Sequence, residues 1–200
     1  MQIKLSYLMA CRKHVNPFHD FKHLRCIHIM ENHAFSSNGA AALFIQDSEL
    51  KDICIAIPSI AIDELEYRFK EKSLNKLDPA DILISISSNE DESFLSYRDI
   101  QVKFVKEDPS LSILKADIKK PEVVTAFPFV SLELLKNFRE SFSCLFGIAE
   151  MNSVALIPSG KTSLIYVDFS ENIHGIIMPV KQSERDYLMK VLESHYRKRI

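Results

Sequence analysis

Short apolar runs rich in Ile, Leu, Val and Phe alternate with polar turns along most of the chain. Runs of this length, bounded by Ser, Asn, Asp and Gly, are typical of antiparallel β-strands. They fall into three groups, and we interpret the first group as a meander of antiparallel strands. The predicted strands cover residues 24–31, 40–47 and 52–58, then 81–87, 93–97 and 100–105, then 143–150, 153–159, 162–169 and 174–180.

Amphipathic helices are predicted between these groups, because apolar residues there recur at helical spacing. One of them pairs Glu64 with Arg68, and Glu66 with Lys70, each four residues apart on its polar face. Another begins at Ser131, a favoured N-cap residue, and the weaker first helix is ended by Pro17. The predicted helices cover residues 5–14, 59–73, 131–141 and 183–200.

The order of the elements predicts an α+β fold built from two similar domains, with antiparallel sheets and amphipathic helices on one face. A helix followed by a set of strands recurs at intervals of roughly 50 to 70 residues, which indicates a repeated unit. Residues 106–124 are polar and contain prolines, as linkers between domains commonly do. The predicted division is therefore a domain over 1–105, a linker over 106–124 and a domain over 125–200 that includes the last helix.

Composition narrows the function. A chain of 200 residues that is 46% hydrophobic is long enough to bury a substantial core. Its 4 glycines include no phosphate-binding glycine motif, and its 4 cysteines include no C-x-x-C pair. No run approaches the length of a membrane span. We therefore expect a soluble cytoplasmic protein with reduced thiols and no contact with a membrane.

A formal net charge of −2 disfavours a simple basic nucleic-acid binder, which normally carries a positive excess to displace counterions from phosphate. The question is therefore whether the positive charges are segregated onto one surface.

The stretch HGIIMPVK, residues 174–181, resembles the closing strand of bacterial DNA polymerase sliding clamps. The preceding helix and hairpins, over residues 127–169, are similar to those that precede this strand in the family, and residues 24–72 follow the outline of a clamp domain. The resemblance implies clamp-like domains and a non-enzymatic replication processivity factor or scaffold. Its partners would be duplex DNA, further copies of itself in a ring of two or three chains, and peptides of polymerases or repair proteins.

The resemblance also implies site residues. Basic side chains on the helices would face duplex DNA, although such residues are also common on ordinary solvated helix faces. The residues at the Met-Pro run would line the pocket for partner peptides, unless the run is simply a packed strand of the core. The candidate DNA-binding residues are Arg12, Lys13, Arg68, Lys70, Lys72, Lys136, Arg139, Lys190 and Arg197, and the candidate pocket residues are Met178, Pro179 and Val180.

The sequence departs from the family pattern in three respects. Bacterial clamps are longer and have three domains, whereas the two-domain clamps of phages and eukaryotes are nearer in size. The three predicted strand groups are fewer than the four that two complete domains need. A helix is also predicted after the Met-Pro strand, where it would cover the peptide pocket.

Two alternatives remain open. The first is an assembly or binding protein of the same fold that does not encircle DNA. The second is a zinc- or His-dependent hydrolase, raised by the His-rich stretch over residues 11–33. Cys11, His14, Cys26 and His28 are a chemically suitable zinc set, but their spacing matches no standard zinc motif. No nucleophile elbow accompanies His19, Asp20 or His174, so we predict a protein that is not an enzyme and needs no cofactor or metal.

Overall fold

The computed structural model describes residues 1–89, 92–110, 130–147, 155–158 and 164–179. The predicted C-terminal helix over 183–200 lies outside these residues. In chain order the elements are β1 (Gln2–Lys4), α1 (Leu5–Arg12), η1 (Lys22–Arg25), β2 (Cys26–Met30), β3 (His33–Ser37), β4 (Ala41–Gln46), η2 (Ser48–Leu50), β5 (Ile55–Pro58), α2 (Ser59–Glu71), η3 (Leu74–Lys76), η4 (Pro79–Asp81), β6 (Leu83–Ser88), β7 (Ser93–Tyr97), β8 (Ile100–Phe104), α3 (Leu132–Phe146), β9 (Ala155–Pro158), β10 (Ile165–Ser170) and β11 (Ile173–Ile177), where η marks a 3₁₀ helix.

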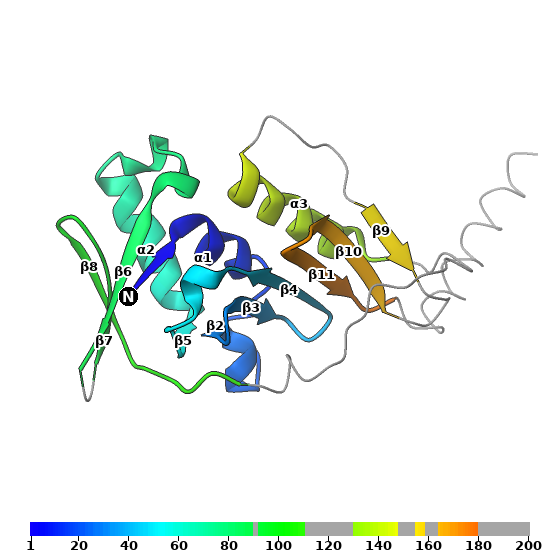
Figure 1. Cartoon of the computed structure of the whole chain (residues 1–200), viewed down its shortest axis with the longest axis horizontal. Helices are drawn as coiled ribbons and strands as arrows, with labels where there is room; N and C mark the ends of the chain where they lie inside the picture. Colours follow the sequence, from blue (N-terminus) through cyan, green and yellow to red (C-terminus); the bar gives the residue numbers. More distant parts are fainter. Residues whose placement is uncertain (90–91, 111–129, 148–154, 159–163, 180–200) are drawn as a thin grey trace, which may run out of the picture.

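Before the predicted linker, the same order of elements occurs twice: one strand, one helix and then three strands (Figure 1). The first unit is β1-α1-β2-β3-β4 and the second is β5-α2-β6-β7-β8. The two units exchange their first strands: β1 pairs with β6, and β5 pairs with β2. Because each unit completes the sheet of the other, neither unit forms its sheet alone.

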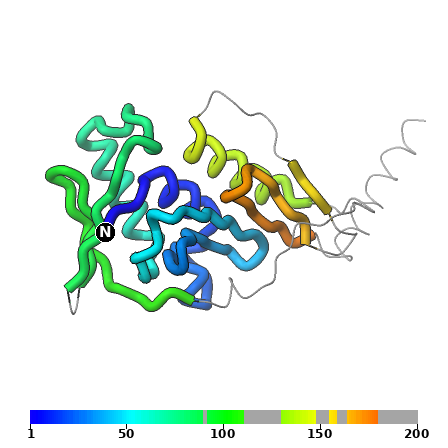
Figure 2. Tube along the Cα trace, viewed as in Figure 1, coloured from blue at the N-terminus to red at the C-terminus, as the bar shows by residue number. Residues whose placement is uncertain are grey.

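A third unit, formed by α3, β9, β10 and β11, extends one of these sheets. Its last strand β11 lies antiparallel to β4, with Gly175 opposite Leu43. The result is a seven-stranded sheet in the order β5-β2-β3-β4-β11-β10-β9, beside a four-stranded sheet in the order β1-β6-β7-β8. Figure 2 shows the third unit, coloured yellow to orange, against the blue and cyan strands of the first. The larger sheet thus takes strands from both sides of the predicted linker.

The three helices and both sheets share a buried core among the described residues. Ile62 and Leu65 of α2, Leu8 of α1 and Phe138 of α3 are all fully buried in it, together with Ile84 of β6. A smaller cluster on β2, β3 and β4 contains Met30, Phe35, Ala42 and Phe44. Strand β2 is buried at every position, which explains why its sequence is apolar without alternation.

The α+β fold with antiparallel sheets and accompanying helices is as predicted. The helices predicted over 5–14, 59–73 and 131–141 correspond to α1, α2 and α3. The strand predicted over 143–150 is wrong at its start, because α3 continues through Phe146. The helix is followed by Gly147, whose φ of +82° is a backbone conformation that glycine adopts readily after a helix.

Two strands escape the sequence pattern. β1 is too short to show a period. β3 ends in Ser36 and Ser37, which look like turn residues but are buried. Their hydroxyls donate hydrogen bonds to the carbonyls of Cys11, at 2.7 Å, and Ala41, at 3.0 Å. Satisfied hydrogen bonds remove the penalty of burying a polar group, so the serines fit a central strand.

We predict that Gly175→Ala destabilises the protein by about 1–3 kcal/mol, because the position is already filled. An added Cβ would lie 2.6 Å from Cζ of Phe138 and 2.9 Å from the carbonyl oxygen of Ala42. Urea unfolding measures the effect. Phe138→Leu combined with Gly175→Ala should cost less than the sum of the two single changes. If the two changes in unfolding free energy add exactly, the ring of Phe138 and strand β11 at Gly175 are not in tight contact.

Candidate nucleic-acid interface

The helices form a layer in which α1 contacts both α2 and α3 (Figure 1). Helices α2 and α3 each turn an apolar stripe toward the core and leave charged residues on the other side, whereas α1 is largely buried and carries one charged residue, Arg12. This helix layer is the place where the structure brings the predicted DNA-binding residues of α1, α2 and α3 together. Lys190 and Arg197 lie outside the described residues.

Two of the predicted cations connect neighbouring helices. The guanidinium of Arg12 on α1 donates to both carboxylate oxygens of Asp63 on α2, from Nε at 2.7 Å and from Nη2 at 2.9 Å. Lys13, which follows α1, lies 3.4 Å from Glu140 on α3. These ion pairs fix α1 against its neighbours at the surface of the layer.

Three more of the predicted cations are paired with nearby acids. Arg68 binds Glu64 at 2.7 Å one turn earlier on α2, as the sequence pattern predicts. Lys72 pairs with Asp99 between β7 and β8, and holds the pKa of that exposed carboxyl below its ordinary value. Lys136 lies 3.8 Å from Glu140 on α3. With these five cations paired, the helix layer is close to neutral.

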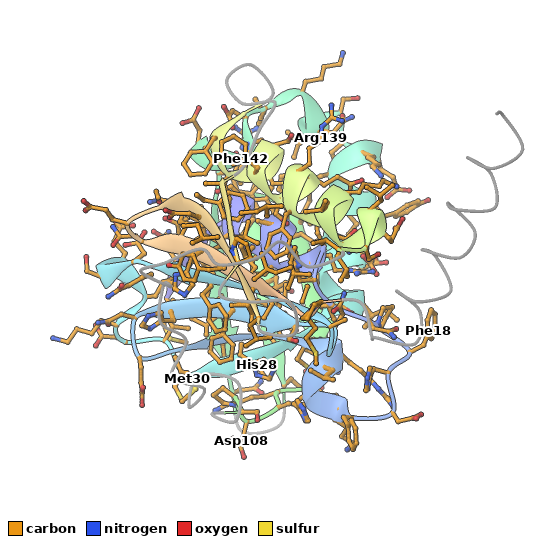
Figure 3. All side chains as sticks on the ribbon, turned by 90° about the vertical axis from the view of Figure 1, so that its right-hand side faces the viewer. Phe18, His28, Met30, Asp108, Arg139 and Phe142 are labelled. Carbon is orange, nitrogen blue, oxygen red and sulfur yellow. The ribbon has the colours of Figure 1, made fainter. Side chains whose placement is uncertain are left out.

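Lys70 and Arg139 are the exceptions among the predicted cations that the structure describes. Both are exposed, and neither forms an ion pair with another described residue. Lys70 borders a shallow apolar pocket between α1, α2 and η3. Arg139 projects outward from α3 (Figure 3). These two side chains can bind a phosphate without first breaking an ion pair within the described part of the protein.

Of the acids that neutralise the layer, Glu64 was predicted from the sequence, whereas Asp63, Asp99 and Glu140 were missed. Glu140 stands four residues after Lys136, so an i,i+4 scan of α3 would have found that pair. Asp63 is paired with Arg12 across 51 positions of sequence. That pairing depends on how two helices pack, and no local pattern reports it.

The residues predicted to form the peptide pocket lie at the end of β11. Met178 is 52% exposed, and its backbone N–H donates to the carbonyl of Ala40 at 2.8 Å. Pro179 is half-buried, and Val180 lies outside the described residues. The preceding strand pairs on both sides, with β4 and β10, so the run continues from the interior of the sheet.

The histidines of the considered zinc set have other partners. Nε2 of His14 lies 3.1 Å from Oγ of Ser141 on α3, and burial lowers the pKa of His14 to about 3. His28 donates from Nε2 to the carbonyl of His23 at 2.7 Å and accepts at Nδ1 from the N–H of Ser110. Its ring is therefore held as one neutral tautomer.

The cysteines of that set are not activated. Burial raises the pKa of the Cys11 thiol to about 12. Burial and the neighbouring Glu107 carboxylate raise the pKa of Cys26 to about 12 as well. Among the described residues, no group of three or more His, Cys, Asp or Glu side chains is arranged to hold a metal ion. The same part of the chain contains no helix long and apolar enough to cross a membrane.

Antiparallel sheets joined edge to edge, with helices gathered in a layer against them, define the class of DNA sliding-clamp folds, and solved structures of that class are similar to this one. A DNA polymerase III subunit beta from Borrelia burgdorferi matches at a TM-score of 0.58 and 10% identity, over 91% of this chain and 64% of its own. The beta sliding clamp of C. crescentus matches at 0.61 and 9% identity, over 90% and 65%. A DnaN sliding clamp from Bartonella birtlesii matches at 0.61 and 10% identity, over 90% and 65%.

The similarity is one of fold. The chain spans less than two thirds of the length of each of these clamps. No protein-family model matches the sequence, and no curated protein sequence matches it. The predicted resemblance to sliding clamps is thus confirmed by the arrangement of the backbone.

We predict that stability falls as the pH is lowered from about 6.5 to about 3, the pKa of His14 in the folded state. The unfolded chain protonates this imidazole in that window while the folded chain does not, so each pH unit costs up to about 1.4 kcal/mol. Burial lowers the pKa values of His28 and His174 in the same direction. Urea unfolding at a series of pH values measures the slope.

His14→Gln should flatten this acid slope, because glutamine does not titrate. Ser141→Ala is the matched control: it leaves the buried imidazole without its partner and lowers stability at neutral pH by about 1–3 kcal/mol, yet keeps the titrating group. An unchanged acid slope in His14→Gln would show that His14 does not carry the effect.

Proposed function

We propose that this protein is a clamp-like, non-enzymatic replication processivity factor or scaffold whose copies assemble into a ring around duplex DNA. The observation that carries the proposal is the repeated strand-exchanged unit with its helices in one layer and a sheet that continues into the next unit. Similar structures are named as DNA polymerase III beta subunits and sliding clamps. We also propose a cytoplasmic location, because the clamps of similar fold come from bacteria, whose DNA lies in the cytoplasm.

A nearly neutral helix layer is compatible with this function. A ring holds DNA by enclosing it, so the contacts with the backbone need to be neither strong nor sequence-specific. Paired cations such as Arg68 and Lys136 keep the layer from binding phosphate tightly, while Lys70 and Arg139 supply weak contacts. Weak contacts allow the ring to move along the duplex.

Ring closure would use the free edge of β8. Strand β8 is the last strand of the second unit, as β4 is of the first, and β4 is joined to the third unit through β11. Within the described residues, no strand pairs with the outer edge of β8. Exposed strand edges readily pair with another chain, so this edge is the proposed contact between copies, in a dimer or a trimer.

The remaining partners are peptides of polymerases or repair proteins. We assign them to the surface at Met178, Pro179 and Val180, where the exposed Met178 offers an apolar contact. The Bartonella clamp of similar fold was solved with griselimycin bound. The proposed domains are residues 1–105 and 125–200, connected by 106–124.

A second candidate is an assembly protein of this fold that does not encircle DNA. The specific observation in its favour is that Arg12, Lys13, Arg68, Lys72 and Lys136 are all in ion pairs. Such a protein would form the same edge-to-edge contacts, with its helix layer facing solvent or another protein. DNA retention separates the two candidates.

We expect the protein to be retained on nicked circular DNA and released when the circle is linearised. The protein is diluted, mixed with the circle and concentrated again so that rings close around DNA, and native mass spectrometry gives the number of copies. Low-salt binding to a short duplex is the control for simple adhesion. A monomer at every concentration, or equal retention on circles and linear DNA, would contradict the ring.

We also expect Lys70→Glu combined with Arg139→Glu to weaken duplex binding and to reduce its salt dependence. The slope of log K against log salt should become shallower by about 0.9 for each phosphate that the variant no longer neutralises. Both side chains are exposed, so stability should stay within about 0.5 kcal/mol of the original value. Fluorescence anisotropy with a labelled duplex measures the affinity.

The matched control is Lys51→Glu, an exposed lysine beside η2 and outside the helix layer. It should leave the salt slope unchanged. Reversals at Arg68 or Lys72 are less clean, because each would also break an ion pair, with Glu64 or with Asp99. If the double variant keeps the salt slope of the original protein, Lys70 and Arg139 do not contact DNA.

A further inference from the structure

The connection between α1 and β2, residues 16–25, presents aromatic rings to solvent. Phe18 is 90% exposed, the highest value among the large hydrophobic side chains described, and Phe21 is 62% exposed. Figure 3 shows Phe18 at the periphery of the molecule, away from the core. We call residues 16–25 the aromatic loop. Neither the fold nor the helix layer accounts for these exposed rings.

The rings of the loop are stacked. The centroids of His19 and Phe21 lie 5.5 Å apart with an interplanar angle of 27°, and those of Phe21 and His23 lie 5.8 Å apart at 22°. The three rings therefore form a short column along the surface, with the more exposed Phe18 beside it in the sequence. The ring of Phe21 is stacked on both sides, so the outer rings of the column and the separate ring of Phe18 are the ones that can offer a π face to a further flat ring.

Hydrogen bonds hold the loop in this shape. The guanidinium of Arg25 donates to the carbonyls of His19 and Asp20. The N–H of Phe18 donates to the side chain of Asn16 at 3.0 Å, and the N–H of Phe21 donates to Nδ1 of His19 at 3.1 Å. The buried Leu24 anchors the end of the loop, and these contacts lower the entropic cost of presenting the rings to a ligand.

The charge around the rings favours a polyanion. Lys22 and Arg25 are exposed on the loop, which contains one acid, Asp20. Aromatic rings interleaved with cations are the combination that binds single-stranded nucleic acid, with bases on the rings and phosphates on the cations. Apart from Phe18 and Phe21, the exposed residues of the loop are all polar, namely Asn16, Asp20, Lys22 and Arg25.

We propose that the aromatic loop binds unpaired DNA, with bases stacked on Phe18 and on the column of His19, Phe21 and His23. Duplex DNA buries its base faces in the helical stack, so this site would distinguish single-stranded from double-stranded DNA. The contact does not require ring closure. It is therefore a property separate from the proposed function, and it is measured separately.

The test measures the affinity of the full-length protein for a labelled oligothymidylate by fluorescence anisotropy. Phe18→Ala and Phe21→Ala are compared with Phe18→Tyr, which keeps the ring. Val105→Ala, after β8, is the matched control, because Val105 is also an exposed hydrophobic residue, at 71%, and lies outside both the loop and the helix layer. An abasic oligonucleotide of the same length reports binding to the backbone alone.

Phe18→Ala should weaken binding to oligothymidylate roughly 5- to 150-fold, and Phe21→Ala should act in the same direction. Phe18→Tyr and Val105→Ala should bind like the original protein. The abasic strand should bind weakly and with the same affinity to the original protein and to Phe18→Ala.

Equal affinity for the abasic strand and for oligothymidylate would overturn the proposal. So would an unchanged affinity in Phe18→Ala, and either result would assign the exposed rings to a protein partner. Neither result affects retention on nicked circles, so a failure here is distinguishable from a failure of the ring.

Discussion

The antiparallel pairing of β4 with β11 is the interaction on which the rest of the structure depends. It joins the strands of the first two units to those of the third, and so makes one sheet of seven strands. Aromatic rings cross the same junction: Phe44 on β4 stacks on His174 of β11 at 5.2 Å. On the helix side, Phe138 rests against Gly175 and His14 meets Ser141. The seven-stranded sheet, the stacked rings and the packing of the helices therefore all depend on the same register between β4 and β11.

Most helices and strands of this fold could be predicted from patterns of residues close in sequence, whereas the pairing of distant strands could not. Apolar runs located most of the strands, and helical spacing located α2 and α3, because both signals depend on residues close in sequence. β3 was missed because Ser36 and Ser37 become strand residues only through hydrogen bonds to distant carbonyls. The exchange of β1 and β5, and the joining of β4 to β11, are choices among sheet edges that alternation alone does not encode.

In the candidate site, too, some features follow from the local sequence and others depend on how the helices pack. The positions of the basic residues on their helices were predictable, since Arg68 and Lys136 fall on the polar faces of amphipathic stripes. Their electrostatic state was not predictable, because Asp63 neutralises Arg12 only when α1 and α2 pack side by side. Local periodicity thus predicted which helix faces carry the basic side chains, and tertiary packing determined how much positive charge these faces present.

Ion pairs at an exposed surface do not remove cations from use. The Arg68–Glu64 and Lys136–Glu140 pairs are both substantially exposed. Pairs of this kind contribute about 0–1 kcal/mol, so a nearby phosphate can take over the cation at little cost. If the proposed function holds, a layer built this way would be nearly neutral in the absence of DNA and would still make brief contacts with a backbone that passes it. A layer of unpaired cations would bind the phosphates tightly and keep the protein at one position on the duplex. Cations that exchange between a carboxylate and a phosphate form new contacts as the DNA moves, as a sliding ring requires.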